Sequence, residues 1–161
     1  MGVEKLATLV NTFGSSLISV SREMGVEVAL QRSEVAQGVH VGGSSVAALV
    51  GVLGQGLQGT LVIMLDNAGF SAVVTAMSGG MIKPDIEDPV ATSVIGELSN
   101  MVSGRALTQS SLGGVDVTPP QLITGAGIRT VPSESPGIKN FTLPFSVAQG
   151  GTLYLVLSFH C

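Results

Sequence analysis

Cysteine occurs only once, as Cys161, and the sequence contains no tryptophan. A single cysteine excludes an internal disulfide and a metal site built from cysteines, and it fits a protein of a reducing compartment. The histidines, His40 and His160, lie far apart and show no metal-ligand spacing. We therefore expect no metal ion bound by this chain and a cytoplasmic location, and we assign no role to His40 or Cys161.

Charge is also scarce, since Asp, Glu, Lys and Arg make up 11% of the chain and the net charge is −4. A nucleic-acid-binding face needs clustered basic residues, so we expect no nucleic-acid partner. The N-terminal segment carries Glu4 and Lys5 among its apolar residues, without the apolar core or cleavage site of a signal peptide.

No charged residue occurs from Val35 to Leu65. A membrane-spanning helix needs about 20 mainly apolar residues, but glycines and glutamines interrupt this run repeatedly. Buried strands joined by glycine turns fit the pattern better, so we expect no membrane insertion.

Common hydrolase motifs are missing as well. The chain has no G-x-S-x-G, no H-E-x-x-H and no glycine loop followed by Lys and Ser or Thr. These absences argue against a hydrolase that supplies its own nucleophile.

What is present begins with a predicted helix over Asp88–Gly114. Asp88 is a suitable N-cap, and Pro89 fits the first helical position because its missing N–H would have no helical partner there. Gly113 and Gly114 are predicted to end the helix, since glycine accepts the left-handed conformation found at helix C-termini.

Hydrophobic periodicity and turn residues predict the other elements. In chain order they are a helix over 3–24, strands over 26–31, 39–41, 46–53 and 59–65, a short helix capped by Asp66 or Asn67 and stopped by Gly79-Gly80, a strand over 115–117 broken by Pro119-Pro120, a loop-rich region over 125–140, and a hairpin of 141–148 with 152–159 around Gly150-Gly151.

The chain also carries an internal repeat. A shift of 89 residues places Asn11 on Asn100 and Gly25–Val28 on Gly114–Val117, and three more residues align 59–65 with 151–157. We interpret residues 1–161 as a single domain with pseudo-repeats 1–66 and 89–161. The predicted fold class is α+β, with two long helices packed across an antiparallel sheet and pseudo-two-fold symmetry.

A polar stripe follows the predicted helix over 88–114. Ser93, Glu97, Asn100 and Gly104 fall within an arc roughly 60° wide at about 100° per residue. Glu97 and Asn100 are three positions apart, so their side chains point the same way. The stripe alone is also compatible with simple solvation of the helix.

The run 95–104, IGELSNMVSG, resembles the signature helix of the CheC/CheX/FliY phosphatases of bacterial chemotaxis. Their pattern is Asp or Ser, three residues, Glu, two residues, Asn and a later proline, which Ser93, Glu97 and Asn100 match. Pro119 and Pro120 lie slightly closer to Asn100 than the family's proline, so neither is assigned a role. The resemblance covers nearly the whole chain and is closest to the single-site CheX type.

The resemblance implies hydrolysis of the aspartyl phosphate on a CheY-like response regulator. Asn100 would orient the attacking water, Glu97 would pair with the regulator's lysine, and Ser93 and Gly104 would contact the partner. The chain would need no cofactor of its own, because the regulator would bring Mg²⁺. The CheX type also implies a homodimer.

Two alternatives stay open at this point. One is a non-catalytic module that binds a response regulator or flagellar switch proteins, and the other is a scaffold that merely dimerises. The repeat places Thr8 where the second half has Glu97, and Glu4 where it has Ser93. Since threonine is too short and uncharged to pair with a partner's lysine, we expect one active site per chain.

Overall fold

The computed structural model describes residues 2–54, 56–110, 114–130 and 135–160. Its elements in chain order are α1 (Val3–Glu23), β1 (Val28–Leu30), the 3₁₀ turn η1 (Arg32–Glu34), β2 (Ala36–Gln37), β3 (Ser44–Gly54), β4 (Leu57–Leu65), α2 (Asn67–Met77), α3 (Pro89–Gln109), β5 (Asp116–Val117), β6 (Gln121–Ile128), β7 (Ile138–Val147) and β8 (Thr152–His160).

The two long helices begin as predicted. The Asp88 carboxylate accepts a hydrogen bond from the Val90 N–H at 2.9 Å, and Pro89 occupies the first turn of α3. α1 ends at Glu23, one residue before the predicted end at Met24. Gly25 follows with a φ of +86°, which glycine adopts without strain.

The end of α3 differs from the prediction, because the helix stops at Gln109 rather than continuing to Gly113-Gly114. Ser110 is the C-cap residue: its N–H bonds to the Ala106 carbonyl, and its hydroxyl donates at 3.1 Å to the Leu107 carbonyl, an acceptor in the last turn. Gly113 lies outside the described residues, and Gly114 has a φ of +69° beyond the helix. The predicted C-cap at Gly113-Gly114 is therefore wrong, and Ser110 occupies the C-cap position.

α2 is capped by Asp66. Its carboxylate accepts the Gly69 N–H at 2.8 Å and also the Thr152 N–H at 3.1 Å, so the cap fastens α2 to the start of β8. The helix is followed by Gly79 and Gly80, both at positive φ, as predicted.

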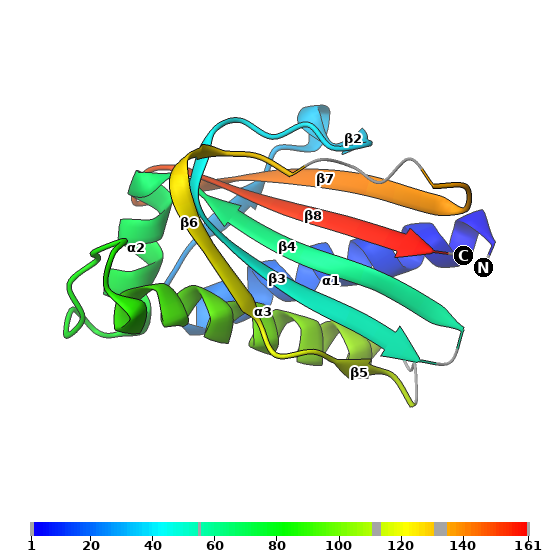
Figure 1. Ribbon diagram of the computed structural model, residues 1–161, viewed down its shortest axis with the longest axis horizontal. Coiled ribbons are helices and arrows are strands. Elements are labelled where there is room, and N and C mark those ends of the chain that lie inside the picture. The colour runs from blue at the N-terminus through cyan, green and yellow to red at the C-terminus, as the bar shows by residue number, and fades with distance from the viewer. Residues whose placement is uncertain (1, 55, 111–113, 131–134, 161) are drawn as a thin grey trace.

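The strands form an antiparallel sheet in the order β1-β7-β8-β4-β3-β5, with β2 paired to β7 and β6 paired to β3 (Figure 1). β7 and β8 make the predicted hairpin, and Gly150 and Gly151 have φ values of +118° and +98° in its turn. The prediction of two long helices and an antiparallel sheet in an α+β fold is confirmed.

Two strand predictions and one loop prediction need correction. Val39–Val41 is not a strand, because the His40 N–H bonds to the Thr142 hydroxyl and the valines pack on the outer sheet face instead of joining a ladder. The loop-rich interpretation of 125–140 is wrong at both ends, since β6 extends through Ile128 and β7 begins at Ile138. Most of β6 is exposed and rich in glycine, so it lacks the apolar signal of a buried strand. The strand predicted over 26–31 is limited to β1.

The register at the centre of the sheet matches the repeat in the sequence. Ile63 of β4 lies opposite Leu155 of β8, and these residues are equivalent when 59–65 is aligned with 151–157. A two-fold axis passing between β4 and β8 would produce this pairing. The same operation would exchange α1 with α3, β1 with β5 and β3 with β7.

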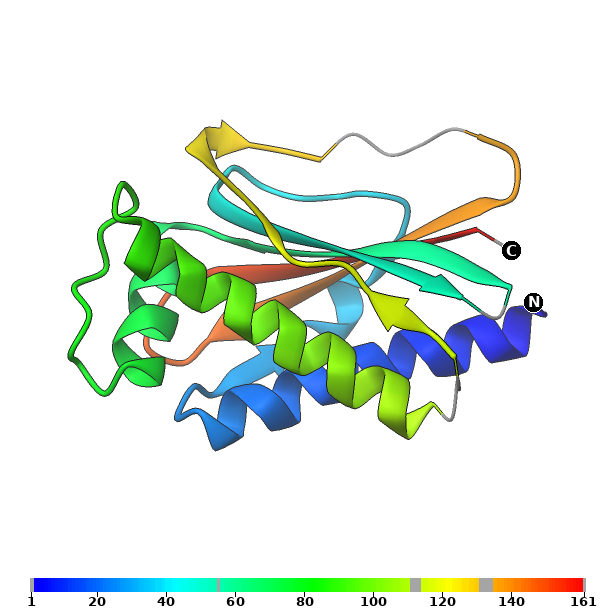
Figure 2. The ribbon, with the colours of Figure 1, turned by 60° about the horizontal axis from the view of Figure 1, so that its bottom comes forward.

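α1 and α3 run beside each other on one face of the sheet, and α2 lies at its end (Figures 1 and 2). Between helices and sheet lies the main core, where the rings of Phe13 and Phe159 are 5.9 Å apart. Along β4, Ile63 faces this core, whereas Val62 and Met64 join a smaller apolar cluster on the other face. Both faces are therefore apolar, which explains the uncharged run in the sequence.

Candidate functional site

α3 turns one side to the sheet and leaves the opposite side open (Figure 2). The buried side holds Ala91, Ile95, Leu98, Val102 and Ala106, all at most 1% exposed. The hydrophobic effect fixes this orientation, because rotating the helix would move the apolar stripe into water.

The predicted site residues lie together on the open side. Ser93, Glu97 and Gly104 are exposed, and Asn100 is partly exposed. Because they recur at intervals of three and four residues, they form a continuous row along α3. The structure therefore brings together all four residues that the sequence singled out.

Glu97 and Asn100 are available to a partner. Within the described part of the chain, neither the Glu97 carboxylate nor the Asn100 side-chain amide makes a hydrogen bond or ion pair. The Ser93 hydroxyl is already engaged, since it donates to the Val90 carbonyl at 2.7 Å. Ser93 can thus still accept a hydrogen bond, but it is less free to donate one.

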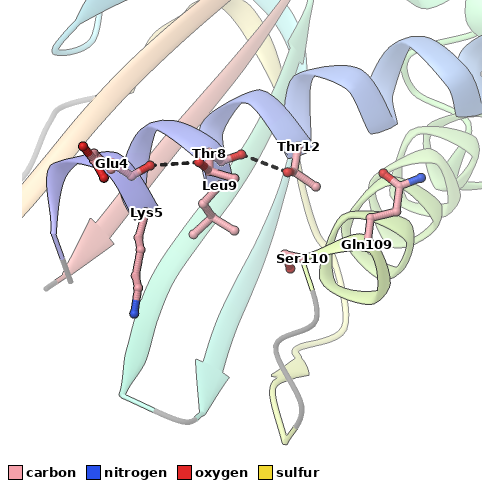
Figure 3. Close-up of a pocket in the computed structure, with 7 residues that line it drawn as sticks. All are labelled: Glu4, Lys5, Thr8, Leu9, Thr12, Gln109 and Ser110. Atoms are coloured by element: carbon pink, nitrogen blue, oxygen red, sulfur yellow. Dashed lines mark hydrogen bonds between the residues drawn. The ribbon is translucent and has the colours of Figure 1, made fainter.

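The matching row on α1 has a different chemistry. Glu4, Thr8, Asn11 and Ser15 are exposed, and the Thr8 hydroxyl donates to the Glu4 carbonyl at 2.9 Å. The same helix borders a groove of about 540 Å³ that reaches the end of α3 (Figure 3). Its described lining is Glu4, Lys5, Thr8, Leu9, Thr12, Gln109 and Ser110. The four candidate residues of α3 do not belong to this groove.

Comparison with known proteins identifies the family of this chain. The model of the family described as "Chemotaxis phosphatase CheX" matches residues 46–145, which include the whole row on α3. The chain belongs to this family. It is 30% identical over 156 residues to the "CheY-P phosphatase CheX" of Thermotoga maritima, covering 90% of this chain and 99% of that protein.

Solved structures of the CheX family share the fold. The chemotaxis protein CheX from Vibrio vulnificus has a TM-score of 0.78 at 26% identity, covering 95% of this chain and 99% of that one. A CheX-CheY-BeF3-Mg+2 complex from Borrelia burgdorferi has a TM-score of 0.70, covering 94% of this chain and 97% of that one. At 20% identity, this second likeness shows the fold alone.

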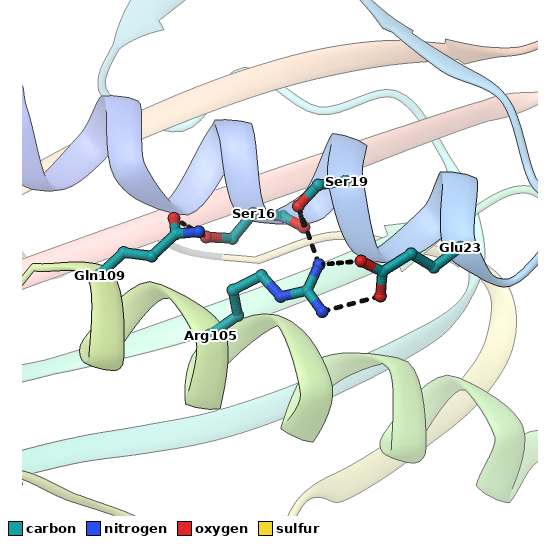
Figure 4. Close-up of polar contacts among 5 residues, drawn as sticks. All are labelled: Ser16, Ser19, Glu23, Arg105 and Gln109. Atoms are coloured by element: carbon teal, nitrogen blue, oxygen red, sulfur yellow. Dashed lines mark hydrogen bonds and ion pairs between the residues drawn. The ribbon is translucent and has the colours of Figure 1, made fainter.

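Arg105 is a residue that sequence reasoning missed in this CheX-family chain. Its guanidinium donates to both carboxylate oxygens of Glu23 on α1, at 2.8 and 2.7 Å, and to the Ser19 hydroxyl at 3.2 Å (Figure 4). These hydrogen bonds raise the pKa of Arg105 and lower the pKa of Glu23. One sequence feature could have drawn attention to Arg105: it is the one basic residue of α3, whose other charged residue is Glu97.

Pro120 and His40, to which the sequence assigned no role, have neighbours outside the row on α3. Pro120 packs against Gly96 of α3, where an added Cβ would lie 3.1 Å from its ring. His40 is exposed, and its Nε2 lies 3.2 Å from the Gln37 carbonyl.

Over the described ranges, no three His, Cys, Asp or Glu residues gather as a metal site would require, and no helix is long and apolar enough to cross a membrane. Cys161 lies outside those ranges.

Proposed function

We propose that this chain is a phosphatase that hydrolyses the aspartyl phosphate of a CheY-like response regulator in chemotaxis signalling. The observation that carries the proposal is the pair of Glu97, which is exposed, and Asn100, which is partly exposed: their side chains lie side by side on α3 and are unpaired within the described structure. Membership of the CheX family and the relative described as a CheY-P phosphatase support it.

The reaction requires a water molecule in line with the phosphorus. Its oxygen bonds to phosphorus as the bond to the aspartyl oxygen breaks, and the products are the aspartate carboxylate and inorganic phosphate, which keeps the protons of the water. Phosphoryl transfer depends chiefly on positioning and electrostatics, and an amide side chain orients the attacking water in GTPases. Asn100 has both the carbonyl acceptor and the NH₂ donors for this task.

Glu97 is proposed to dock the regulator. Its carboxylate is exposed and free of any cation within the described residues, so it can pair with a lysine of the partner in a charge-assisted hydrogen bond. Glu97 and Asn100 are one helical turn apart, so a lysine bound to Glu97 fixes the register of the phosphoryl group over Asn100. Ser93 and Gly104 lie at the two ends of this contact.

The proposal also divides the reaction between two proteins. The chain contributes Asn100 and Glu97 and needs no cofactor of its own, whereas the regulator contributes the phosphoryl group, its lysine and Mg²⁺. We propose that both proteins meet in the cytoplasm, and that this chain works as a homodimer.

The test is the decay of a CheY-like regulator carrying a labelled phosphoryl group, measured with and without the purified chain. We expect faster release of inorganic phosphate at a substoichiometric amount of this chain, because a catalyst turns over. Binding of the regulator without faster decay would overturn the proposal in favour of the non-catalytic binding module. Absence of both binding and acceleration would favour the scaffold interpretation.

A further inference from the structure

No contact with the described residues requires position 104 of α3 to be glycine. Glycine in a helix interior is less stable than alanine because it loses more backbone freedom on folding. Gly14 and Gly96 are explained by packing, since an added Cβ would lie 3.0 Å from the Leu143 side chain and 3.1 Å from Leu122 and Pro120, respectively. At Gly104 an added Cβ would meet no atom of the described residues within 4 Å. The space in front of this helix position is open.

This open space is part of a shallow hollow of about 460 Å³ between α3 and α1. Its described lining is Val20, Met101, Gly104, Arg105, Thr108 and Gln109. Arg105 is held in place by Glu23 and Ser19, and Gln109 accepts a hydrogen bond from Ser16 at 3.4 Å (Figure 4). The border of the hollow is thus fixed by contacts between the two helices.

The hollow continues the proposed site. Gly104 follows Asn100 by four residues, which places it about 6 Å further along the same face of α3. A regulator whose phosphoryl group lies over Asn100 therefore also covers position 104. Met101 is partly exposed and gives the lining an apolar part, Val20 lies fully buried beneath it, and the charge of Arg105 is already paired with Glu23. An uncharged aliphatic side chain fits this chemistry best.

We propose that Gly104 is a docking determinant: the absence of a side chain lets the regulator approach α3 closely and place an aliphatic side chain in the hollow. This inference rests on the proposed phosphatase function and adds how the substrate protein is positioned. The corresponding place in the first pseudo-repeat is Ser15, which is also exposed. It offers a matched control on a helix without the Glu97 counterpart.

The experiment compares Gly104→Ala, Gly104→Leu and the control Ser15→Leu with the parent chain. Thermal unfolding reports on the fold, and steady-state dephosphorylation at varied concentrations of phosphorylated regulator gives KM and kcat separately. We expect Gly104→Ala to unfold at a Tm about 2–4 °C higher, because alanine favours the helix and nothing obstructs its Cβ. We expect Gly104→Leu to raise KM by about tenfold or more with kcat within about twofold, since docking rather than water orientation is impaired.

Several outcomes would overturn the inference. They are a parental KM for Gly104→Leu, an equal loss in Ser15→Leu, or a lower Tm for Gly104→Ala, which would make the glycine structural. The failure of the phosphatase function looks different, because the parent chain itself would then not accelerate the decay. A parent and a Gly104→Leu variant that are equally active would reject only the docking role.

Discussion

Arg105 of α3 and Glu23 of α1 join the two long helices through a two-point ion pair, with N–O distances of 2.8 and 2.7 Å. A guanidinium presents its donors in a planar fork that matches both oxygens of a carboxylate, so the pair fixes orientation as well as distance. The pair lies beside the hollow at Gly104. The ion pair therefore holds α1 against α3 next to the face of α3 that carries Asn100.

This pair predicts a pH dependence of stability. The hydrogen bonds from Arg105 lower the pKa of Glu23 below its ordinary value of 4.5, so the stabilisation is present above that value and is lost as the pH falls through the lower folded pKa. Glu23→Gln should reduce Tm slightly at pH 7, and the difference from the parent should vanish in acid. Glu27→Gln is the control, since among the described residues the Glu27 carboxylate has one ionic contact, at 3.6 Å with the exposed Arg22. A difference that grows on acidification would contradict the assignment.

Asn100→Ala is expected to remove most of the acceleration of dephosphorylation, by about tenfold or more, since each 1.36 kcal/mol of lost transition-state stabilisation slows the reaction tenfold. Stability should change by less than about 0.5 kcal/mol, because alanine is favourable at this partly exposed helix position. Labelled phosphate release measures the first quantity, and chemical denaturation the second. Glu97→Ala should additionally raise KM, and near-parental turnover by the Asn100 variant would reject the mechanism.

Asn11→Ala is expected to leave the dephosphorylation rate within about twofold of the parent, although the repeat aligns Asn11 with Asn100. Thr8 stands where the second half has Glu97, and its hydroxyl is occupied by the Glu4 carbonyl. Asn11 is exposed on α1, so stability should fall by less than about 0.5 kcal/mol. The assay should be run beside Asn100→Ala; equal losses in both variants would mean that α1 carries a working site.

Metal content gives a separate prediction. Elemental analysis of the chain purified without added metal should find no stoichiometric ion, and the Mg²⁺ dependence of the reaction should follow the regulator's own affinity for Mg²⁺. A chelator should therefore stop dephosphorylation without lowering the Tm of this chain. An ion retained at one per chain, or a Tm that falls with the chelator, would be the contrary result.

A homodimer is expected in solution. The strongly apolar runs 60–65 and 152–159 offer no edge for pairing, because they lie in β4 and β8 in the middle of the sheet. Two exposed apolar residues near the β6 edge of the sheet support a homodimer: Ile123 on the edge strand β6 is 43% exposed, and Leu53 on the neighbouring strand β3 is 59% exposed. Light scattering at micromolar concentration should give twice the monomer mass, and Ile123→Lys should lower it. Met81→Lys, at a position 90% exposed in the α2–α3 connection, should not. A monomer mass for the parent would contradict the prediction.

Much of the site was readable from the sequence because it lies within one helix. Ser93, Glu97, Asn100 and Gly104 share a face through helical geometry alone, and the Asp88-Pro89 start is a local signal. The predicted hairpin and the glycine turns after α2 are local in the same sense. These features could be predicted without knowing which helices and strands pack against one another.

Tertiary structure decided the features that depend on contacts between distant segments. β6 is a strand because β3 offers it an edge, although its own residues are mostly exposed and weakly apolar. Val39 and Val41 pack over the outer sheet face rather than pairing as a strand. In the same way, the Arg105–Glu23 pair joins residues 82 positions apart, and the open space at Gly104 exists because α1 and α3 leave a hollow there. The sequence pattern determines which residues of a helix share one face, because helical geometry is local. Packing between helices and strands determines the shape of the surface around that face, and therefore what can bind there.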